Sequence, residues 1–253
     1  MAAGKVSLMV FLVMFVVIGA RYLLLSKGGR RFDIRRIAGL EAIDEAVGRA
    51  TEMGRPVHLT FGSGPLDASV LAGFQILRAT AGACARMGVP ILVTVCQPET
   101  FPMAQEVIRE AYIQASRQED YRSDSVRFYS ETQQGYTSGV LELIESEKPA
   151  ANFMVGSFLA ESLTIAECGN RVGAIQIGGT TQTAQLPFFV AACDYTLIGD
   201  EMFATGAYLS QAPDQIGVLA AEEMGKYLVI GLIVLGSLLS TFGVATLSRM
   251  VSR

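Results

Sequence analysis

The residues of this chain that could do chemistry lie in short polar loops, each of which follows a run of apolar residues. These loops are GSGPLD (62–67), QPETFP (97–102), SETQQG (130–135), SFLAES (157–162), GGTTQT (178–183) and GDEM (199–202). They contain several acids and no Lys, Arg or His. Carboxylates in such loops suit a divalent cation, an amine or a hydroxyl-rich ligand. Acids in the first turn of a helix also complement the helix dipole, so the pattern has a structural explanation as well.

Two of the loops are similar to phosphate-binding turns. Residues 62–64 (Gly-Ser-Gly) stand where a dinucleotide-binding loop would open a helix, but Asp67 replaces the third glycine of G-x-G-x-x-G. A carboxylate at that position tends to repel a pyrophosphate. Residues 178–181 (Gly-Gly-Thr-Thr) offer backbone N–H groups and two hydroxyls to an anion at the start of a helix. An ordinary glycine turn with a threonine cap explains the same residues.

A serine hydrolase is not indicated. Ser157 ends a candidate strand, but the pattern G-x-S-x-G requires glycine where Leu159 stands. The single histidine, His58, lies early in its strand, nearer the opposite edge of the sheet, so a Ser-His-acid triad is not supported. We expect His58 to be a half-buried strand residue. Lys148 precedes its strand and is equally badly placed to act as a base.

Carboxylates are the remaining candidates for catalysis. Glu131 and Glu161 could act as an acid-base pair, and Glu131, Glu161 and Glu201 are the candidate metal ligands. The four cysteines form no CxxC pair and have no neighbouring histidine, so a zinc site is not indicated and we expect small buried residues. The sequence identifies no cofactor and no reaction.

Strands and helices alternate through the middle of the chain. Candidate strands lie at 56–61, 90–96, 125–130, 151–157, 173–178 and 194–199. Nearly continuous apolar strands that alternate with helices are typical of a parallel sheet covered on both faces. Six βα units fit a Rossmann-like, doubly wound α/β fold with a mostly parallel sheet of about six strands better than an eight-unit barrel.

The doubly wound order predicts where a pocket should form. The first and fourth strands are neighbours at the point where the strand order reverses, and the fifth strand lies beside the fourth. The loops that follow these three strands should therefore converge. The candidate ligand-binding residues are Gly62, Ser63, Gly64, Ser157, Glu161, Gly178, Gly179, Thr180, Thr181 and Gln182.

Two apolar segments flank the α/β domain. Residues 6–25 and 227–247 are each long enough to cross a hydrocarbon core, which takes roughly 20 apolar residues in a helix. A cleaved signal peptide is the alternative for the first segment, but the apolar run continues past Arg21 and a good cleavage motif is missing. We therefore predict transmembrane helices at 6–25 and 227–247, a basic linker at 26–36 and a cytoplasmic α/β domain at 37–225.

Basic residues near the spans predict the orientation. They are denser on the domain side, in SKGGRRFDIRR (26–36) and at Lys226, than on the other side, where Lys5, Arg249 and Arg253 lie. The positive-inside rule then places the domain in the cytoplasm of a two-pass protein of the cell membrane. A net charge of -4 gives no reason to expect nucleic acid. The expected partners are the lipid bilayer and, through glycines such as Gly231 in the second span, a second copy or another membrane protein.

Four stretches of the sequence carry a family resemblance. They are IRRIAGLEAIDEAVGRATEMGRPVH, KPAANFMVGSFLAES, VGAIQIGGTTQTAQLPFF and FVAACDYTLIGDEMF. In them the chain resembles an uncharacterised prokaryotic family of membrane-anchored α/β proteins, classed as a domain of unknown function. The resemblance covers most of the chain and implies its architecture, but it supplies no reaction and no catalytic residue.

These observations predict a membrane-tethered cytoplasmic binding or assembly module. The prediction depends on a polar strand edge that has neither a recognisable base nor a nucleophile. One alternative is a metal-assisted enzyme that uses the acids at the carboxyl edge of the sheet. Another is a structural subunit of a membrane complex.

Overall fold

The computed structural model describes residues 9, 13, 16–22, 24–25, 38–210 and 213–241. The chain divides into two compact units. One comprises Arg36–Ser210 and holds the α/β domain, and the other comprises Met1–Arg35 together with Gln211–Arg253. The candidate ligand-binding and metal-binding residues all belong to the first unit.

The domain is built on a sheet that has six parallel strands among the described residues, in the order β3-β2-β1-β4-β5-β6. The strands are β1 (Val57–Thr60), β2 (Ile91–Val95), β3 (Val126–Phe128), β4 (Ala151–Val155), β5 (Ile175–Thr180) and β6 (Tyr195–Ile198). β1 pairs with both β2 and β4, so the strand order reverses between β1 and β4. This confirms the α/β fold with a parallel sheet, and the strand order is that of a doubly wound sheet.

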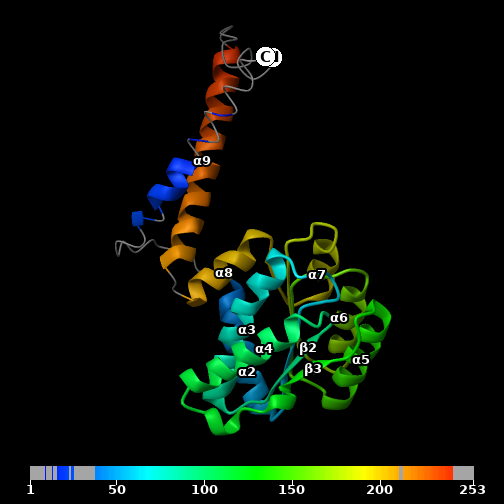
Figure 1. The fold of residues 1–253 in the computed structure, drawn as a ribbon. Coiled ribbons are helices and arrows are strands. Elements are labelled where there is room, and N and C mark those ends of the chain that lie inside the picture. Colours follow the sequence, from blue (N-terminus) through cyan, green and yellow to red (C-terminus); the bar gives the residue numbers. More distant parts are fainter. Residues whose placement is uncertain are drawn as a thin grey trace. The chain divides into compact units, whose positions relative to one another are not determined.

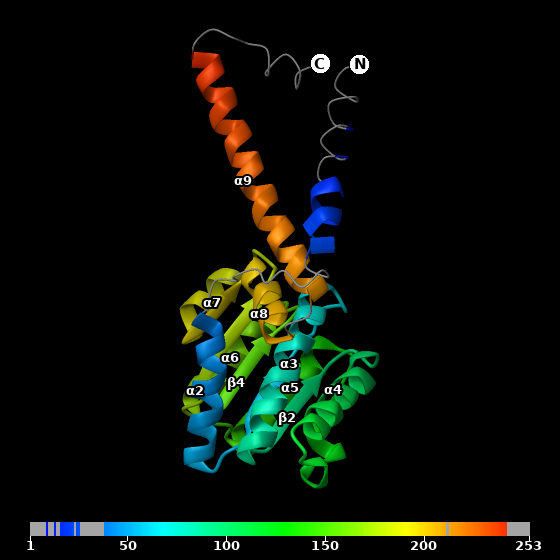
Figure 2. The same ribbon diagram turned by 90° about the vertical axis from the view of Figure 1, so that its left-hand side faces the viewer.

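Helices cover both faces of the sheet. The helices are α2 (Ala38–Met53), α3 (Ala68–Met87), α4 (Thr100–Gln114), α5 (Gln133–Glu147), α6 (Glu161–Arg171), α7 (Leu186–Ala192) and α8 (Asp200–Ser210). Helices α2, α3 and α4 lie on one face and α5 and α6 lie on the other (Figure 1; Figure 2). Two short 3-10 helices, η1 (Gln118–Asp120) and η2 (Ser123–Ser125), connect α4 to β3.

The two faces of the sheet differ in chemistry because successive strand residues point to opposite sides. On the face with α2, α3 and α4, every inward residue of the central strands is apolar, for example Leu59, Val93 and Phe153. The other face carries a mixture of apolar and polar side chains, among them His58 and Asn152. All residues of β1, β2, β4 and β5 are buried. The nearly continuous burial explains why these strands lack an alternating pattern.

Local sequence signals set the ends of α3 and α5. Asp67 precedes α3 and its Oδ1 accepts a hydrogen bond from the Val70 N–H at 3.1 Å. Gly88 ends the same helix with φ 70°, a left-handed conformation that glycine adopts without steric cost. Thr132 begins α5, and its hydroxyl accepts from the Gly135 N–H at 3.4 Å. Such caps contribute about 1 kcal/mol each.

The second unit contains α9 (Pro213–Thr241), a helix of 29 residues. The predicted spans at 6–25 and 227–247 lie only partly within the described residues, and α9 covers the first part of the second span. Among the described residues, one helix is long and apolar enough to cross a membrane, Ala68–Met87. That helix is α3, and 67% of its most apolar stretch is buried inside the structure, as expected of a core helix.

Candidate functional site

The predicted loops meet at the carboxyl edge of the sheet, where β1, β4 and β5 lie side by side. The Gly64 N–H donates to the Ser157 carbonyl oxygen at 2.9 Å, and the Ser157 N–H donates to the Phe61 carbonyl oxygen at 2.9 Å. The Gly156 N–H donates to the Gly179 carbonyl oxygen at 3.0 Å. The loops after β1 and β4 are therefore in direct contact, as the strand order requires.

Glycine is needed in the 62–64 loop because the loop after β4 approaches its backbone closely. Gly62 has φ +83°, and a Cβ added there would lie 2.2 Å from the Ser157 carbonyl oxygen. A Cβ on Gly64 would lie 2.2 Å from the Ser157 Oγ. The two glycines thus serve the contact between the loops.

Glu161 is the central side chain of this contact. It begins α6, and only 3% of its surface is exposed. Its Oε1 accepts from the Ser63 N–H at 2.8 Å, and its Oε2 accepts from the Gln133 Nε2 at 2.9 Å. The Leu159 N–H lies 3.3 Å from one carboxylate oxygen and 3.2 Å from the other. N–H donors from three separate segments of the chain therefore surround one buried carboxylate.

Three glutamine side chains complete the site. The Gln97 Nε2 donates to the carbonyl oxygens of Ser63 and Gly64, both at 3.3 Å. The Gln182 Nε2 donates to the Ser157 Oγ at 2.7 Å, and Gln133 binds Glu161. Sequence analysis selected Gln182 but missed Gln97 and Gln133. Both lie in loops that it had assigned to this edge, so their position was a signal for them.

Ser63 has a buried side chain whose oxygen has no hydrogen-bond partner in the described part of the chain. It is 7% exposed, and its Oγ accepts and donates no hydrogen bond there. An unpaired buried hydroxyl costs about 1–3 kcal/mol. This side chain therefore marks a point at which a ligand group would be favourable.

The predicted loop 178–183 begins later than expected. The strand β5 includes Gly178, Gly179 and Thr180, and all three are buried. The predicted start of the ligand loop at Gly178 is therefore wrong. A Cβ on Gly178 would lie 2.5 Å from the Phe189 ring, which explains a glycine inside the strand. Thr181 does follow the strand, and its hydroxyl bonds to the Ser69 hydroxyl at the start of α3.

The candidate metal ligands do not form a group. Glu131 and Glu201 are exposed whereas Glu161 is buried. The Glu201 Oε2 accepts from the Ile198 N–H at 3.1 Å. Over the described residues, no three His, Cys, Asp or Glu side chains are placed to hold a metal ion.

His58 lies in a buried hydrogen-bonded row across the polar face of the sheet. Its Nδ1 is 2.7 Å from the Asn152 Oδ1, and its Nε2 is 3.0 Å from the Thr94 Oγ1. The Asn152 Nδ2 then donates to the Gln176 Oε1 at 2.7 Å, and the Tyr136 hydroxyl bonds to Thr60 at the other end. His58 is 0% exposed rather than half-buried, which corrects the expectation from the sequence.

Burial controls the protonation of this row. The pKa of His58 is lowered from 6.5 to about 4 as the net result of three effects: desolvation, which lowers it most, the hydrogen bond to Asn152, which raises it, and the positive charge of Arg127, which lowers it. His58 is therefore neutral at pH 7. Because Nδ1 faces an amide oxygen, Nδ1 carries the proton and Nε2 accepts from Thr94. A neutral, fully partnered imidazole inside the sheet fills a structural role.

The cysteines are free, and three of them are buried as expected. Cys96 lies beside the candidate site, and its Sγ is 3.3 Å from the Ser130 carbonyl oxygen. The pKa of this thiol is raised to about 11, mainly by desolvation and in addition by the negative charges of Glu161 and Glu131. Cys96 is thus a thiol rather than a reactive thiolate at neutral pH.

One comparison with known proteins identifies the family. A family model described as a domain of unknown function, DUF6754, matches residues 1–251. The chain belongs to this family. The match confirms the resemblance to an uncharacterised family, and it assigns no reaction. Searches of curated proteins and of solved structures gave no match.

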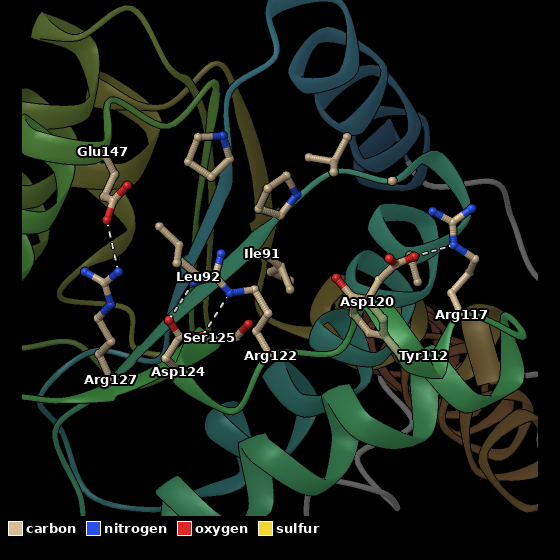
Figure 3. A pocket seen from close by; sticks show the side chains of 15 residues that line it. Ile91, Leu92, Tyr112, Arg117, Asp120, Arg122, Asp124, Ser125, Arg127 and Glu147 are labelled. Atoms are coloured by element: carbon tan, nitrogen blue, oxygen red, sulfur yellow. Dashed lines mark hydrogen bonds and ion pairs between the residues drawn. The ribbon is translucent and has the colours of Figure 1, made fainter.

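The DUF6754 chain also has a cavity of about 420 Å³ at the amino edge of the sheet (Figure 3). Sequence analysis did not predict this cavity. Three arginines from different segments line it, and each forms an ion pair with a neighbouring carboxylate (Figure 3). The pairs are Arg117–Asp120, Arg122–Asp124 and Arg127–Glu147. The lining charges are thus balanced within the DUF6754 domain itself.

Another basic residue at the amino edge binds backbone oxygens. Arg55 donates to the carbonyl oxygens of Lys148, Pro149 and Val172, the last at 2.9 Å. These carbonyls follow the ends of α5 and α6, where the helix dipole is negative. Arg55 therefore has a structural role in the DUF6754 domain, because it binds carbonyl oxygens at the ends of two helices.

Proposed function

We propose that this chain is a membrane-tethered module whose cytoplasmic α/β domain binds a small polar molecule at the carboxyl edge of its sheet. The observation that carries the proposal is the convergence of the 62–64 loop, the 157–161 loop and Gln182 beside β1 and β4. In doubly wound sheets, ligands bind in the crevice outside the carboxyl ends of the strands at this point.

The chemistry of the site favours a ligand that forms hydrogen bonds. Ser63 offers a buried hydroxyl without a partner among the described residues. Thr181 and Gln182 are partly exposed at the same edge of the sheet, where they bond to Ser69 and Ser157. A ligand with hydroxyl, amide or amine groups would satisfy Ser63 and exchange water for protein donors and acceptors.

The site supports binding better than catalysis. The Ser157 Oγ accepts from Gln182, and His58 lies inside the sheet with both ring nitrogens occupied. For the metal-assisted alternative, Glu161 would have to act as an oxygen ligand. Its two oxygens already accept hydrogen bonds from Ser63, Leu159 and Gln133. A metal would have to displace these donors before it could bind.

Exposed apolar side chains on α9 support the membrane tether. Tyr227, Ile230 and Ile233 are 69%, 56% and 62% exposed, and they lie in the described part of the predicted second span. Exposed apolar surface of this kind is favourable in a hydrocarbon environment. The basic segment 26–36 supports the cytoplasmic orientation.

The binding site can be tested by thermal denaturation of the purified full-length chain in detergent. A panel of nucleosides, sugars, polyols, amino acids and polyamines would be added singly. We expect at least one class to raise the melting temperature of the wild type. Ser63→Ala should lower the affinity for that ligand roughly tenfold, because it removes one hydrogen bond worth about 1.4 kcal/mol.

Thr183→Ala provides the matched control for the Ser63 variant. Thr183 also loses one hydroxyl, and it is exposed on a loop at the same edge. A ligand that binds Ser63→Ala and the wild type equally well would place the binding site elsewhere and refute the proposal.

A further inference from the structure

The 62–64 loop uses all of its backbone N–H groups inside the protein. The Gly62 N–H donates to the Thr60 Oγ1 at 3.3 Å, and the Gly64 N–H donates to the Ser157 carbonyl oxygen at 2.9 Å. The Ser63 N–H donates to the Glu161 carboxylate at 2.8 Å. In a dinucleotide-binding loop, such N–H groups face the phosphate of the ligand. Here a carboxylate from the protein takes one of them.

The surroundings of Glu161 are those of a bound anion. Three donors point at its two oxygens, namely the backbone N–H groups of Ser63 and Leu159 and the side-chain amide of Gln133. Only 3% of the surface of Glu161 is exposed. Charge-assisted hydrogen bonds of this kind are roughly twice as strong as neutral ones. The carboxylate group is therefore held in place at the loop.

We infer that Glu161 is the specificity-determining residue of the candidate site and that its carboxylate restricts the site to ligands without a phosphate group. The inference rests on the binding site proposed above. A ligand phosphate would have to displace the carboxylate or lie beside it. Asp67 adds a second carboxylate at the end of the same loop. Like charges at such short range disfavour a phosphorylated ligand.

The loops offer no positive charge that would offset this repulsion. The segments 62–67, 97–102, 130–135, 157–162, 178–183 and 199–202 contain no Lys, Arg or His. A nucleoside, a sugar, a polyol or an amine meets no such barrier. These are the ligand classes that the site accepts.

Chemical rescue tests the role of Glu161 directly. Glu161→Ala removes the carboxylate and leaves three N–H donors around an empty position. We expect the full-length variant in detergent to melt at a lower temperature than the wild type. Added acetate should restore several degrees of this loss relative to chloride at the same ionic strength, because acetate can occupy the position of the carboxylate. The wild type should show no acetate response.

Glu131→Ala is the matched control, since Glu131 is an exposed acid on the same edge. It should melt close to the wild type and should not respond to acetate. If a folded Glu161→Ala variant has wild-type stability, or if acetate gives no specific rescue, the inference is wrong.

Calorimetry on the wild type gives a second test that does not depend on the folding of a variant. ADP and inorganic phosphate should show no binding in the micromolar range. Micromolar binding of either at this site would overturn the inference but leave the proposed binding function standing. Conversely, acetate rescue together with no ligand for the wild type would refute the binding function and leave Glu161 as a structural anion that holds the loops together.

Discussion

The buried imidazole of His58 predicts that the stability of the domain depends on pH in a defined range. The pKa of His58 is about 4 in the folded state and about 6.5 in an unfolded chain. Between these values the unfolded chain binds a proton that the folded chain excludes. The stability of the domain is therefore not reduced by His58 well above pH 6.5, and it falls because of His58 as the pH falls from 6.5 towards 4.

The magnitude follows from the two pKa values. One pKa unit corresponds to about 1.4 kcal/mol. Going from pH 7.5 to pH 5, the free energy of unfolding should fall by about 2 kcal/mol because of His58 alone. Because the side chain is fully buried, solvent does not screen this effect. The penalty is large relative to the 5–15 kcal/mol stability of a typical domain.

His58→Gln isolates this contribution. A glutamine amide can donate to Asn152 and accept from Thr94, but it does not titrate. Urea unfolding of the full-length chain in detergent, followed by circular dichroism at several pH values, would compare the variant with the wild type. Contributions of other titrating groups cancel in the difference. The difference should grow by about 2 kcal/mol between pH 7.5 and pH 5.

Two results would refute this reasoning. One is a parallel loss of stability in the wild type and in His58→Gln. The other is an imidazole resonance that titrates near pH 6.5 in the folded chain. The NMR signal is unambiguous because the chain contains 1 histidine.

Two further predictions concern the loop contact and the orientation of the chain. Gly62→Ala should destabilise the domain by at least about 1–2 kcal/mol, because Gly62 has a positive φ and a Cβ there would clash with the Ser157 carbonyl oxygen. In the control variant Gly48→Ala in α2, the added Cβ meets no atom within 4 Å, so this variant should stabilise the domain by about 0.5–1 kcal/mol. Urea unfolding measures the stability of both variants, and an equal change in the two would contradict the close approach of Gly62 to Ser157. Glu119→Cys, at an exposed position of η1, should react with a membrane-impermeant thiol reagent only after cells are opened, while Arg253→Cys should react in intact cells. Labelling of Glu119→Cys in intact cells would contradict the predicted orientation.

The sheet was predictable because its strands carry a strong local signal. Segments such as PILVTVC are short, apolar and bounded by glycine or proline, and they alternate with helices of ordinary length. The observed strands begin and end within two residues of the predicted ones. Once the elements alternate in this way, few sheet orders remain, and the contact between the loops after β1 and β4 follows from the order.

Side-chain partners from distant strands were not predictable. Gly178 and Gly179 have the residue types of a turn, yet they continue β5 because they pair with β4 and β6 on either side. The Phe189 ring of α7 occupies the space that a side chain at 178 would need. A single histidine in a strand is typical of a half-exposed position. The burial of His58 becomes tolerable only because Asn152 from β4 and Thr94 from β2 supply both hydrogen bonds. Neither partner can be recognised from the residues next to His58.

Glu161 shows the same limit at the candidate site. The 62–64 loop has two glycines of a dinucleotide loop, and its local sequence gives no reason, apart from Asp67, why it should not hold a phosphate. The carboxylate that accepts the Ser63 N–H lies 98 positions away in the chain. Parallel strand order brings it there, because β4 lies next to β1 and the loops that follow both strands end at one edge. The ligand class of such a loop is therefore decided by the charge that the neighbouring strand delivers to it, and a glycine pattern has to be interpreted together with the loop of the adjacent strand.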